Sequence, residues 1–180
     1  MFKKILVVVM LISLSACSYF NKKDIAAEDS LYQAYYNSIK DNSKYTANNN
    51  YFKISAEMSQ LPQGNYLYYV FIDEPQIAMY DIKVMIMEDG FIMNEDSDLL
   101  ATVGIVDDTK VNMIPYQVDS TLGYQKGIVL SGNASAEEVL LDVLVTWNNE
   151  NMTKSFREFY QIKLNMNGFD LISNESDGTN

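Results

Sequence analysis

The side chains of this chain that could do chemistry are mostly carboxylates, grouped in pairs and triplets. The groups are Asp73-Glu74, Glu88-Asp89, Glu95-Asp96-Asp98, Asp107-Asp108 and Glu137-Glu138. Hard cations such as Ca²⁺ need several such oxygens that converge on one point. Asn94, Asp96 and Asp98 have the one-three-five spacing of a calcium-binding loop, but Leu99 and Ile105 stand where that loop needs glycine and glutamate. We expect solvated turn acids and no bound metal, with an irregular calcium loop as the alternative.

Missing residue types exclude several classes of catalysis. The 180 residues include no histidine and one cysteine. Ser–His and Cys–His nucleophiles and His-containing metal sites are therefore excluded. Motifs for a nucleophilic serine or a phosphate-binding glycine loop do not occur. We expect no enzymatic activity and no cofactor, and a hydrolase with paired carboxylates is the remote alternative.

Tyrosines crowd one segment of the chain and form a candidate binding surface. Tyr66, Tyr68 and Tyr69 lie within four residues of one another, and Tyr80 follows in the next apolar segment. Exposed tyrosines bind sugars, peptides and proteins, because the ring is apolar and the hydroxyl is polar. Tyrosine is also a good strand former, so packing within a sheet is the alternative role for the same residues.

The charge balance excludes one class of partner and favours another. The chain has 24 acidic and 13 basic residues, which gives a formal net charge of −11. Nucleic-acid binding needs clustered Lys and Arg, so we expect no nucleic-acid partner. From Ile25 onward, 9 basic residues stand against 23 acidic ones. An acidic body attracts a basic protein by electrostatic steering, which raises the association rate more than the affinity.

The first residues of the chain differ in character from the rest. Lys3 and Lys4 precede an uninterrupted apolar run over residues 5–12. This run is shorter than the roughly 20 apolar residues that a membrane-spanning helix needs. A positive start followed by a short apolar run is typical of a secretory signal peptide, which we expect over residues 1–16.

A four-residue motif, Leu14-Ser15-Ala16-Cys17, ends this segment and contains the chain's only cysteine. With this motif the sequence resembles a bacterial prolipoprotein, whose lipobox is an aliphatic residue, two small residues and a cysteine. The resemblance implies cleavage between Ala16 and Cys17 and a diacylglyceryl thioether on Cys17. It also implies attachment to the cell membrane at the extracytoplasmic face, with residues 17–24 as a lipidated tether. An ordinary secretory signal peptide is the alternative.

Apolar residues at a spacing of three and four predict a helix after the tether. We expect the helical segment over residues 25–48, with regular helix to about Lys44. Asp24 is placed to cap its start. The apolar stripe consists of Ala27, Leu31, Ala34, Tyr35, Ser38 and Ile39. We expect this stripe to pack on the chain's own domain, and a partner-binding face is the alternative.

After residue 50 the apolar pattern changes to a period of two, which predicts β-strands. The expected strands cover residues 52–59, 66–73, 79–88, 99–106, 110–115, 124–130, 139–147 and 156–164, with a short segment near 169–172. No helices alternate with them, and this favours an antiparallel sandwich over a parallel α/β sheet. We expect a mainly β chain with a sandwich of about seven or eight strands over residues 51–172 and a disordered tail over residues 173–180.

The stretch from Tyr66 to Leu164 resembles the small immunoglobulin-like domains of uncharacterised surface lipoproteins of Gram-positive bacteria. Trp147, near the end of an apolar strand, fits such a sandwich, and a single cysteine leaves no disulfide within the chain. The resemblance implies an immunoglobulin-like antiparallel sandwich with an N-terminal amphipathic helix, and no catalytic residues.

These features predict a lipid-anchored, non-catalytic interaction protein at the extracytoplasmic face of the cell membrane. The expected partner is a surface or secreted protein, basic in charge, and the role is immunity-type protection or that of an accessory subunit. The alternative is an envelope lipoprotein that binds a small ligand or glycan. An exposed apolar patch on the helix or on the tyrosine-rich strand would favour the protein partner, and a concave groove lined by tyrosines and carboxylates would favour the small ligand.

Overall fold

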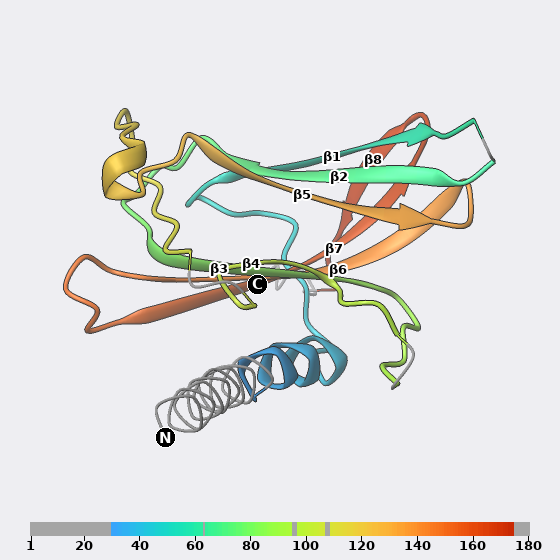
Figure 1. Cartoon of the computed structure of the whole chain (residues 1–180), viewed down its shortest axis with the longest axis horizontal. Helices are drawn as coiled ribbons and strands as arrows, with labels where there is room; N and C mark the ends of the chain where they lie inside the picture. The colour runs from blue at the N-terminus through green and yellow to red at the C-terminus, as the bar shows by residue number, and fades with distance from the viewer. Residues whose placement is uncertain (1–29, 63, 95–96, 107–108, 175–180) are drawn as a thin grey trace, which may run out of the picture.

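The computed structural model describes residues 30–62, 64–94, 97–106 and 109–174. In this part of the chain, eight β-strands form two antiparallel sheets that pack face to face, and one helix lies against the outer face of the larger sheet (Figure 1). The prediction of a mainly β antiparallel sandwich with a helix before it is confirmed.

Each sheet combines strands from distant parts of the sequence. The smaller sheet has the order β1-β2-β5 and contains β1 (Lys53–Gln60), β2 (Tyr66–Asp73) and β5 (Gly127–Ala134). The larger sheet has the order β4-β3-β6-β7-β8. Its strands are β3 (Tyr80–Glu88), β4 (Ala101–Val103), β6 (Glu138–Asn148), β7 (Ser155–Asn165) and β8 (Gly168–Ile172).

The strand order follows an immunoglobulin-like arrangement with two differences. A constant-type immunoglobulin sandwich has sheets of strands A-B-E-D and C-F-G. By chain order and pairing, β1, β2 and β5 take the places of A, B and E, and β3, β6 and β7 take those of C, F and G. Here β4 pairs with β3 instead of β5, and β8 extends the larger sheet beyond β7. Trp147 lies on β6, at the place of strand F, whereas immunoglobulin domains carry their buried Trp on strand C.

Regular alternation along the strands builds the core between the two sheets. The inward-facing residues of β6 are all buried, namely Val139, Leu141, Val143, Val145 and Trp147. They meet the inward-facing residues of the smaller sheet, which include Ile54, Val70 and Ile72. Full burial of one such side chain stabilises the fold by about 1.5–3 kcal/mol. The core therefore holds the two sheets together without a disulfide.

Within the described residues the helix covers residues 30–40, and it packs on the chain's own domain, as expected. Its expected start at residue 25, with Asp24 as the cap, lies outside the described residues. Its buried face agrees only in part with the expected stripe: Ile39 is buried as expected, but Tyr32 and Tyr36, outside the stripe, are also buried, and Ala34 is exposed. The hydroxyl of Tyr32 accepts a hydrogen bond from the backbone N–H of Leu100 at 2.9 Å. Two tyrosine rings can thus lie under the helix because their hydroxyls reach the polar backbone at the edge of the contact.

Within the described residues, no helix is long and apolar enough to span a membrane.

The helix ends at Lys40, earlier than the expected boundary near Lys44 or residue 48. The N–H groups of Asp41 and Asn42 still bond to the carbonyls of Asn37 and Ile39, at 2.9 and 3.0 Å, but two later N–H groups have partners elsewhere in the domain. The Tyr45 N–H donates to Oδ1 of Asn174 at 2.8 Å, and the Thr46 N–H donates to the Phe159 carbonyl at 3.0 Å. These bonds tie the segment after the helix to β7 and to the end of β8, so the helix does not continue.

The expected strand over residues 99–106 is only three residues long, because it stops at Gly104. Gly104 has a φ of +68°, and a side chain there would meet the carbonyl oxygen of Ile82 at 2.7 Å. This conformation is available to glycine at little cost, and it turns the chain away from β3. Ile105, the next residue, is buried against the helix instead of within the sandwich.

The expected strands over residues 110–115 and 124–130 are also corrected. The first forms only isolated bridges, including the one between Met79 and Met113. The second is shifted, since β5 begins at Gly127. The apolar residues Val111 and Met113 are buried in the core, so their alternation reflects the anchoring of a loop.

Candidate functional site

Two of the four tyrosines expected at a binding surface are buried. Tyr66 and Tyr68 are 6% and 4% exposed and face the sandwich core. The Tyr68 ring lies over Gly132 on β5, where a Cβ atom would approach the tyrosine hydroxyl to 2.3 Å. Burial, with a smaller contribution from the charge of Glu88, raises the pKa of Tyr68 to about 12. These two residues serve the packing of the smaller sheet.

Tyr69 and Tyr80 are partly exposed, but they lie on different sheets. Tyr69 is on the outer face of β2, with its ring 6.3 Å from that of Phe71. Tyr80 begins β3 in the larger sheet, next to a register shift between Tyr80 and Lys83. The structure therefore does not bring Tyr66, Tyr68, Tyr69 and Tyr80 together on one surface.

The lipidation motif lies outside the described residues, which begin at residue 30. The cleavage site between Ala16 and Cys17 and the tether stay predictions. Of the disordered tail expected over residues 173–180, residues 175–180 lie outside the described residues, whereas Asn174 is hydrogen-bonded to Tyr45 and Ser43.

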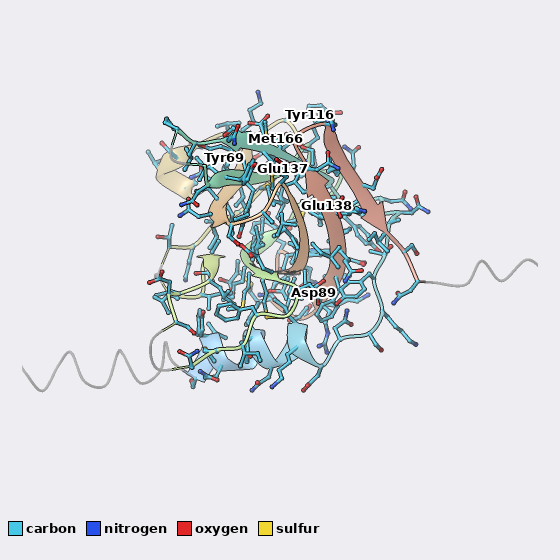
Figure 2. The ribbon with its side chains drawn as sticks, turned by 90° about the vertical axis from the view of Figure 1, so that its right-hand side faces the viewer. Tyr69, Asp89, Tyr116, Glu137, Glu138 and Met166 are labelled. Atoms are coloured by element: carbon cyan, nitrogen blue, oxygen red, sulfur yellow. The ribbon has the colours of Figure 1, made fainter. Side chains whose placement is uncertain are left out.

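One end of the sandwich is acidic, and Figure 2 looks onto it, with Asp89, Glu137 and Glu138 labelled. Glu137 accepts a hydrogen bond from the Tyr66 hydroxyl at 3.2 Å, and Glu138 pairs with Lys163 at 3.1 Å. Burial raises the pKa of the nearby Glu88 carboxyl. Among the described residues, no three Asp, Glu, His or Cys side chains are grouped so that they could hold a metal ion.

Asp142 is a buried carboxyl that the sequence analysis does not predict. It lies on the outer face of β6, is 4% exposed, and accepts a hydrogen bond at Oδ1 from Gln161 at 3.0 Å. Burial raises the pKa of Asp142, and the hydrogen bonds from Gln161 and Tyr45 offset part of this shift. A single Asp within the apolar run of β6 is the sequence feature that could have revealed it. Asp89, whose charge acts on Asp142, is exposed, so only one of these two acids is buried.

Exposed apolar side chains gather instead on the connection between β4 and β5. We call residues 114–122 the Tyr116 loop. Tyr116 is fully exposed, and Val118 and Leu122 are 68% and 58% exposed. Figure 1 shows this connection at one end of the sandwich, and Figure 2 shows Tyr116 at the margin on the side of the smaller sheet, opposite the helix. Grouped exposed apolar residues are typical of interaction sites.

The base of the Tyr116 loop is fixed to the domain. Met113 is fully buried and exchanges two backbone hydrogen bonds with Met79, at 2.8 and 2.9 Å. Asn112 receives a further bond from the Gln125 N–H at 2.8 Å and donates its own N–H to Gly123 at 2.9 Å. The loop is thus held on both sides, so the exposed side chains are presented by a rigid base.

The tip of the loop is a turn in which a tyrosine takes an unfavourable backbone conformation. The Gln117 N–H donates to the Ile114 carbonyl at 3.1 Å, which closes a four-residue turn with Pro115 second and Tyr116 third. Tyr116 has a φ of +64°. Proline in the second place and a positive φ in the third are the features of a type II turn, where the third residue is usually Gly or Asn. A bulky residue in this conformation costs about 1–3 kcal/mol, and such strain clusters at functional sites.

A hollow of about 430 Å³ lies beside this turn. Its walls are the connection between β2 and β3, residues 73–76, and the side chains of Ile114, Tyr116 and Val118. Gln117, Gln125 and Lys126 complete the lining, so the hollow combines apolar side chains with both acidic and basic ones. A partner side chain inserted in the hollow would contact the Tyr116 ring at the same time.

The sequence contained one indication of this site. Pro115 interrupts the apolar alternation directly before Tyr116, and a proline at such a place indicates a turn instead of a strand. The exposure of Tyr116 depends on the anchoring of Met113 in the core, which is a contact between distant residues.

Comparison with protein-family models, curated proteins and solved structures gives no match for this chain.

Proposed function

We propose that this protein is a lipid-anchored, non-catalytic interaction protein at the extracytoplasmic face of the cell membrane. In this proposal it binds a basic protein partner through the Tyr116 loop. The observation that carries the proposal is the exposure of Tyr116, Val118 and Leu122 on a loop whose base is buried. Tyrosine is among the residues that contribute most binding energy at protein interfaces.

The conformation of Tyr116 supports this function. A glycine at this place would satisfy the turn without strain, and a polar residue would keep the surface soluble. Tyrosine offers neither advantage to the folded domain, because its ring is fully exposed. The residue is therefore better explained by a contact that forms when a partner binds.

The charges around the loop favour a basic partner. Asp73, Glu74 and Lys126 line the hollow, Glu74 is paired with Lys53 at 2.9 Å, and Asp119 lies within the loop. These three carboxylates exceed the two ammonium groups by one negative charge. Hydrogen bonds from the Thr121 hydroxyl and N–H hold the pKa of Asp119 below its usual range. The net charge of −11 adds a long-range attraction for a cationic protein. An immunity-type protein for an exported toxin and an accessory subunit of an envelope complex both fit this description.

The helix supports the proposal by its position. It covers the outer face of the larger sheet, whereas Tyr116 lies on the side of the smaller sheet (Figure 2). The proposed lipid on Cys17 precedes the helix in the chain. A partner could then bind the Tyr116 loop without competing with the helix for the same face.

The test is crosslinking of the native, lipidated protein in its own membranes, followed by mass spectrometry. Wild type, Tyr116→Gly and Met166→Gln are compared, since Met166 is an exposed apolar residue on the turn between β7 and β8, at the other end of the sandwich. We expect one stoichiometric protein partner, and its crosslinks are expected to map to the Tyr116 loop. Capture of this partner should be lost in Tyr116→Gly and kept in Met166→Gln. Recovery of only glycan or wall fragments, or equal capture by Tyr116→Gly, would contradict the proposal.

A further inference from the structure

A second concavity lies between the helix and the outer face of the larger sheet. It has a volume of about 400 Å³ and is separate from the Tyr116 loop. The helix contributes Leu31, Ala34 and Tyr35 to its lining, and the sheet contributes residues of β3, β6 and β7. The size of this cleft is within the range of small-molecule sites, which is about 300–1,000 Å³.

A polar row crosses the sheet part of the cleft. Lys83 pairs with Thr146, and Thr146 pairs with Arg157, so one position on each of three neighbouring strands lines up. Neighbouring strands are about 4.8 Å apart, and side chains at paired positions point to the same face. The Thr146 hydroxyl is hydrogen-bonded to the Tyr35 hydroxyl at 2.5 Å. Two cationic side chains therefore flank a pair of hydroxyls that are already oriented by each other.

Arg157 is the only arginine of the chain. It is exposed, lines the cleft, and forms no ion pair within 4 Å with any residue that the structure describes. Lys83, in contrast, is paired with Asp81 at 2.6 Å, and Asn148 donates a further hydrogen bond to Asp81 at 3.3 Å. The guanidinium of Arg157 is thus the group with donors available for a ligand, and its planar fork matches a carboxylate.

The local charge selects the kind of anion. Arg157 and Lys83 carry two positive charges, and Asp81 carries one negative charge, so the lining of the cleft has a surplus of one positive charge. A monoanion balances this surplus. A dianion would exceed it within a chain whose net charge is −11.

We propose that this cleft binds a small monocarboxylate with an apolar body. The carboxylate contacts Arg157 and the Thr146–Tyr35 hydroxyl pair, and the apolar body lies along Leu31, Ala34 and Leu144. This site is independent of the partner proposed for the Tyr116 loop, because the two share no residue.

The probe is 4-fluorobenzoate, followed by ¹⁹F NMR on the full chain in detergent, with protein-free micelles as the blank. The neutral 4-fluorobenzamide and the dianionic 4-fluorophenyl phosphate are the comparison compounds. We expect saturable binding of the benzoate with a Kd on the order of 1 mM, as suits a ligand of this size. The amide and the phosphate are expected to bind at least tenfold more weakly.

Two variants locate the site. Arg157→Gln is expected to weaken benzoate binding at least tenfold, with an unchanged urea midpoint because Arg157 is exposed. Lys163→Gln, on the same strand but outside the cleft, is the matched control and is expected to bind like wild type. Unchanged binding in Arg157→Gln, equal binding of the amide, or no saturable binding would overturn the proposal. Tighter binding of the phosphate would overturn its assignment to a monocarboxylate.

Discussion

Trp147 and Phe156 stack face to face across the β6–β7 hairpin, with ring centroids 5.4 Å apart and 8° between their planes. The Phe52 ring packs edge-on against the indole, with 5.8 Å between the ring centroids. The ammonium of Lys154 lies 4.7 Å from the centroid of the Phe156 ring. Trp147 is 1% exposed. The single tryptophan therefore closes one end of the core and links the hairpin to the segment before β1.

Trp147→Ala is expected to lower the free energy of unfolding by about 3–5 kcal/mol, because it leaves a large cavity among aromatic neighbours. Urea unfolding followed by circular dichroism measures this change. Met152→Ala, at an exposed position in the same hairpin, is the control and is expected to leave the midpoint unchanged. An unchanged midpoint in Trp147→Ala would place the indole outside the core.

Gly132→Ala tests whether the Tyr68 ring is packed over position 132 in the smaller sheet. A Cβ atom at position 132 would approach the Tyr68 hydroxyl to 2.3 Å and its ring carbon Cζ to 2.4 Å. The ring would have to leave its place, and such overpacking costs about 1–3 kcal/mol. The control is Ser131→Ala, which faces solvent on the same strand. If both variants unfold at the wild-type urea concentration, Tyr68 is not held by this contact.

The strands that could be predicted from the sequence are those whose alternation and burial agree. On β6, each second residue from Val139 to Trp147 is apolar and buried, so its period of two identified both the strand and its inner face. The segment around Met113 has a similar alternation, yet it forms only bridges. Its apolar residues anchor a loop, and a period of two does not distinguish this role from that of a strand.

The candidate site was less predictable for a related reason. Alternation places Tyr66 and Tyr68 on one face of β2 and Tyr69 on the other, but it does not say which face is inward. That choice depends on Gly132, whose missing side chain leaves room for Tyr68 on the inner face. Pro115 indicates a turn before Tyr116, but the exposure of Tyr116 could not be predicted, because it depends on a positive φ and on bonds between Met79 and Met113.

Asp142 predicts how stability depends on pH. Its pKa is raised in the folded state, so between the unfolded and folded pKa values the folded protein binds the extra proton. The contribution of Asp142 to the free energy of unfolding therefore increases as the pH falls from neutral through the pKa that Asp142 has in the folded protein. Glu88, whose pKa is also raised by burial, acts in the same direction.

Asp142→Asn isolates the contribution of this one carboxyl. The difference in unfolding free energy, wild type minus Asp142→Asn, is expected to increase as pH is lowered from 7.5 to about 4.5. Urea titrations at several pH values measure it. Asp170→Asn, at an exposed position on β8, is the control variant. A difference that stays constant with pH would show that Asp142 is not desolvated.

Cys17→Ala tests the predicted lipid anchor. Acyl chains contribute about 0.8 kcal/mol per buried CH₂, so two of them hold a protein firmly on a membrane. Without the thiol no thioether forms, and we expect the variant either to stay unprocessed or to be released, which gel mobility and a phase-partition assay measure, and to lose palmitate labelling. Ser18→Ala, which keeps Cys17, is the control. Normal membrane retention of unlabelled Cys17→Ala would exclude a lipid as the anchor.

Tyr116→Gly is expected to remove partner binding without lowering the stability of the fold. Tyrosine at a φ of +64° costs about 1–3 kcal/mol, whereas glycine adopts this conformation freely. The larger entropy of glycine in the unfolded chain offsets part of the relief, so we expect the free energy of unfolding to stay the same or to rise by up to about 1 kcal/mol. Urea unfolding measures it, with Gly123→Ala as the opposite control, since Gly123 has a φ of +70° and its Cβ atom would meet the Lys110 carbonyl at 2.8 Å. A clear loss of stability in Tyr116→Gly would mean that the exposed ring serves the fold, and the Tyr116 loop would then lose its main argument as a binding site.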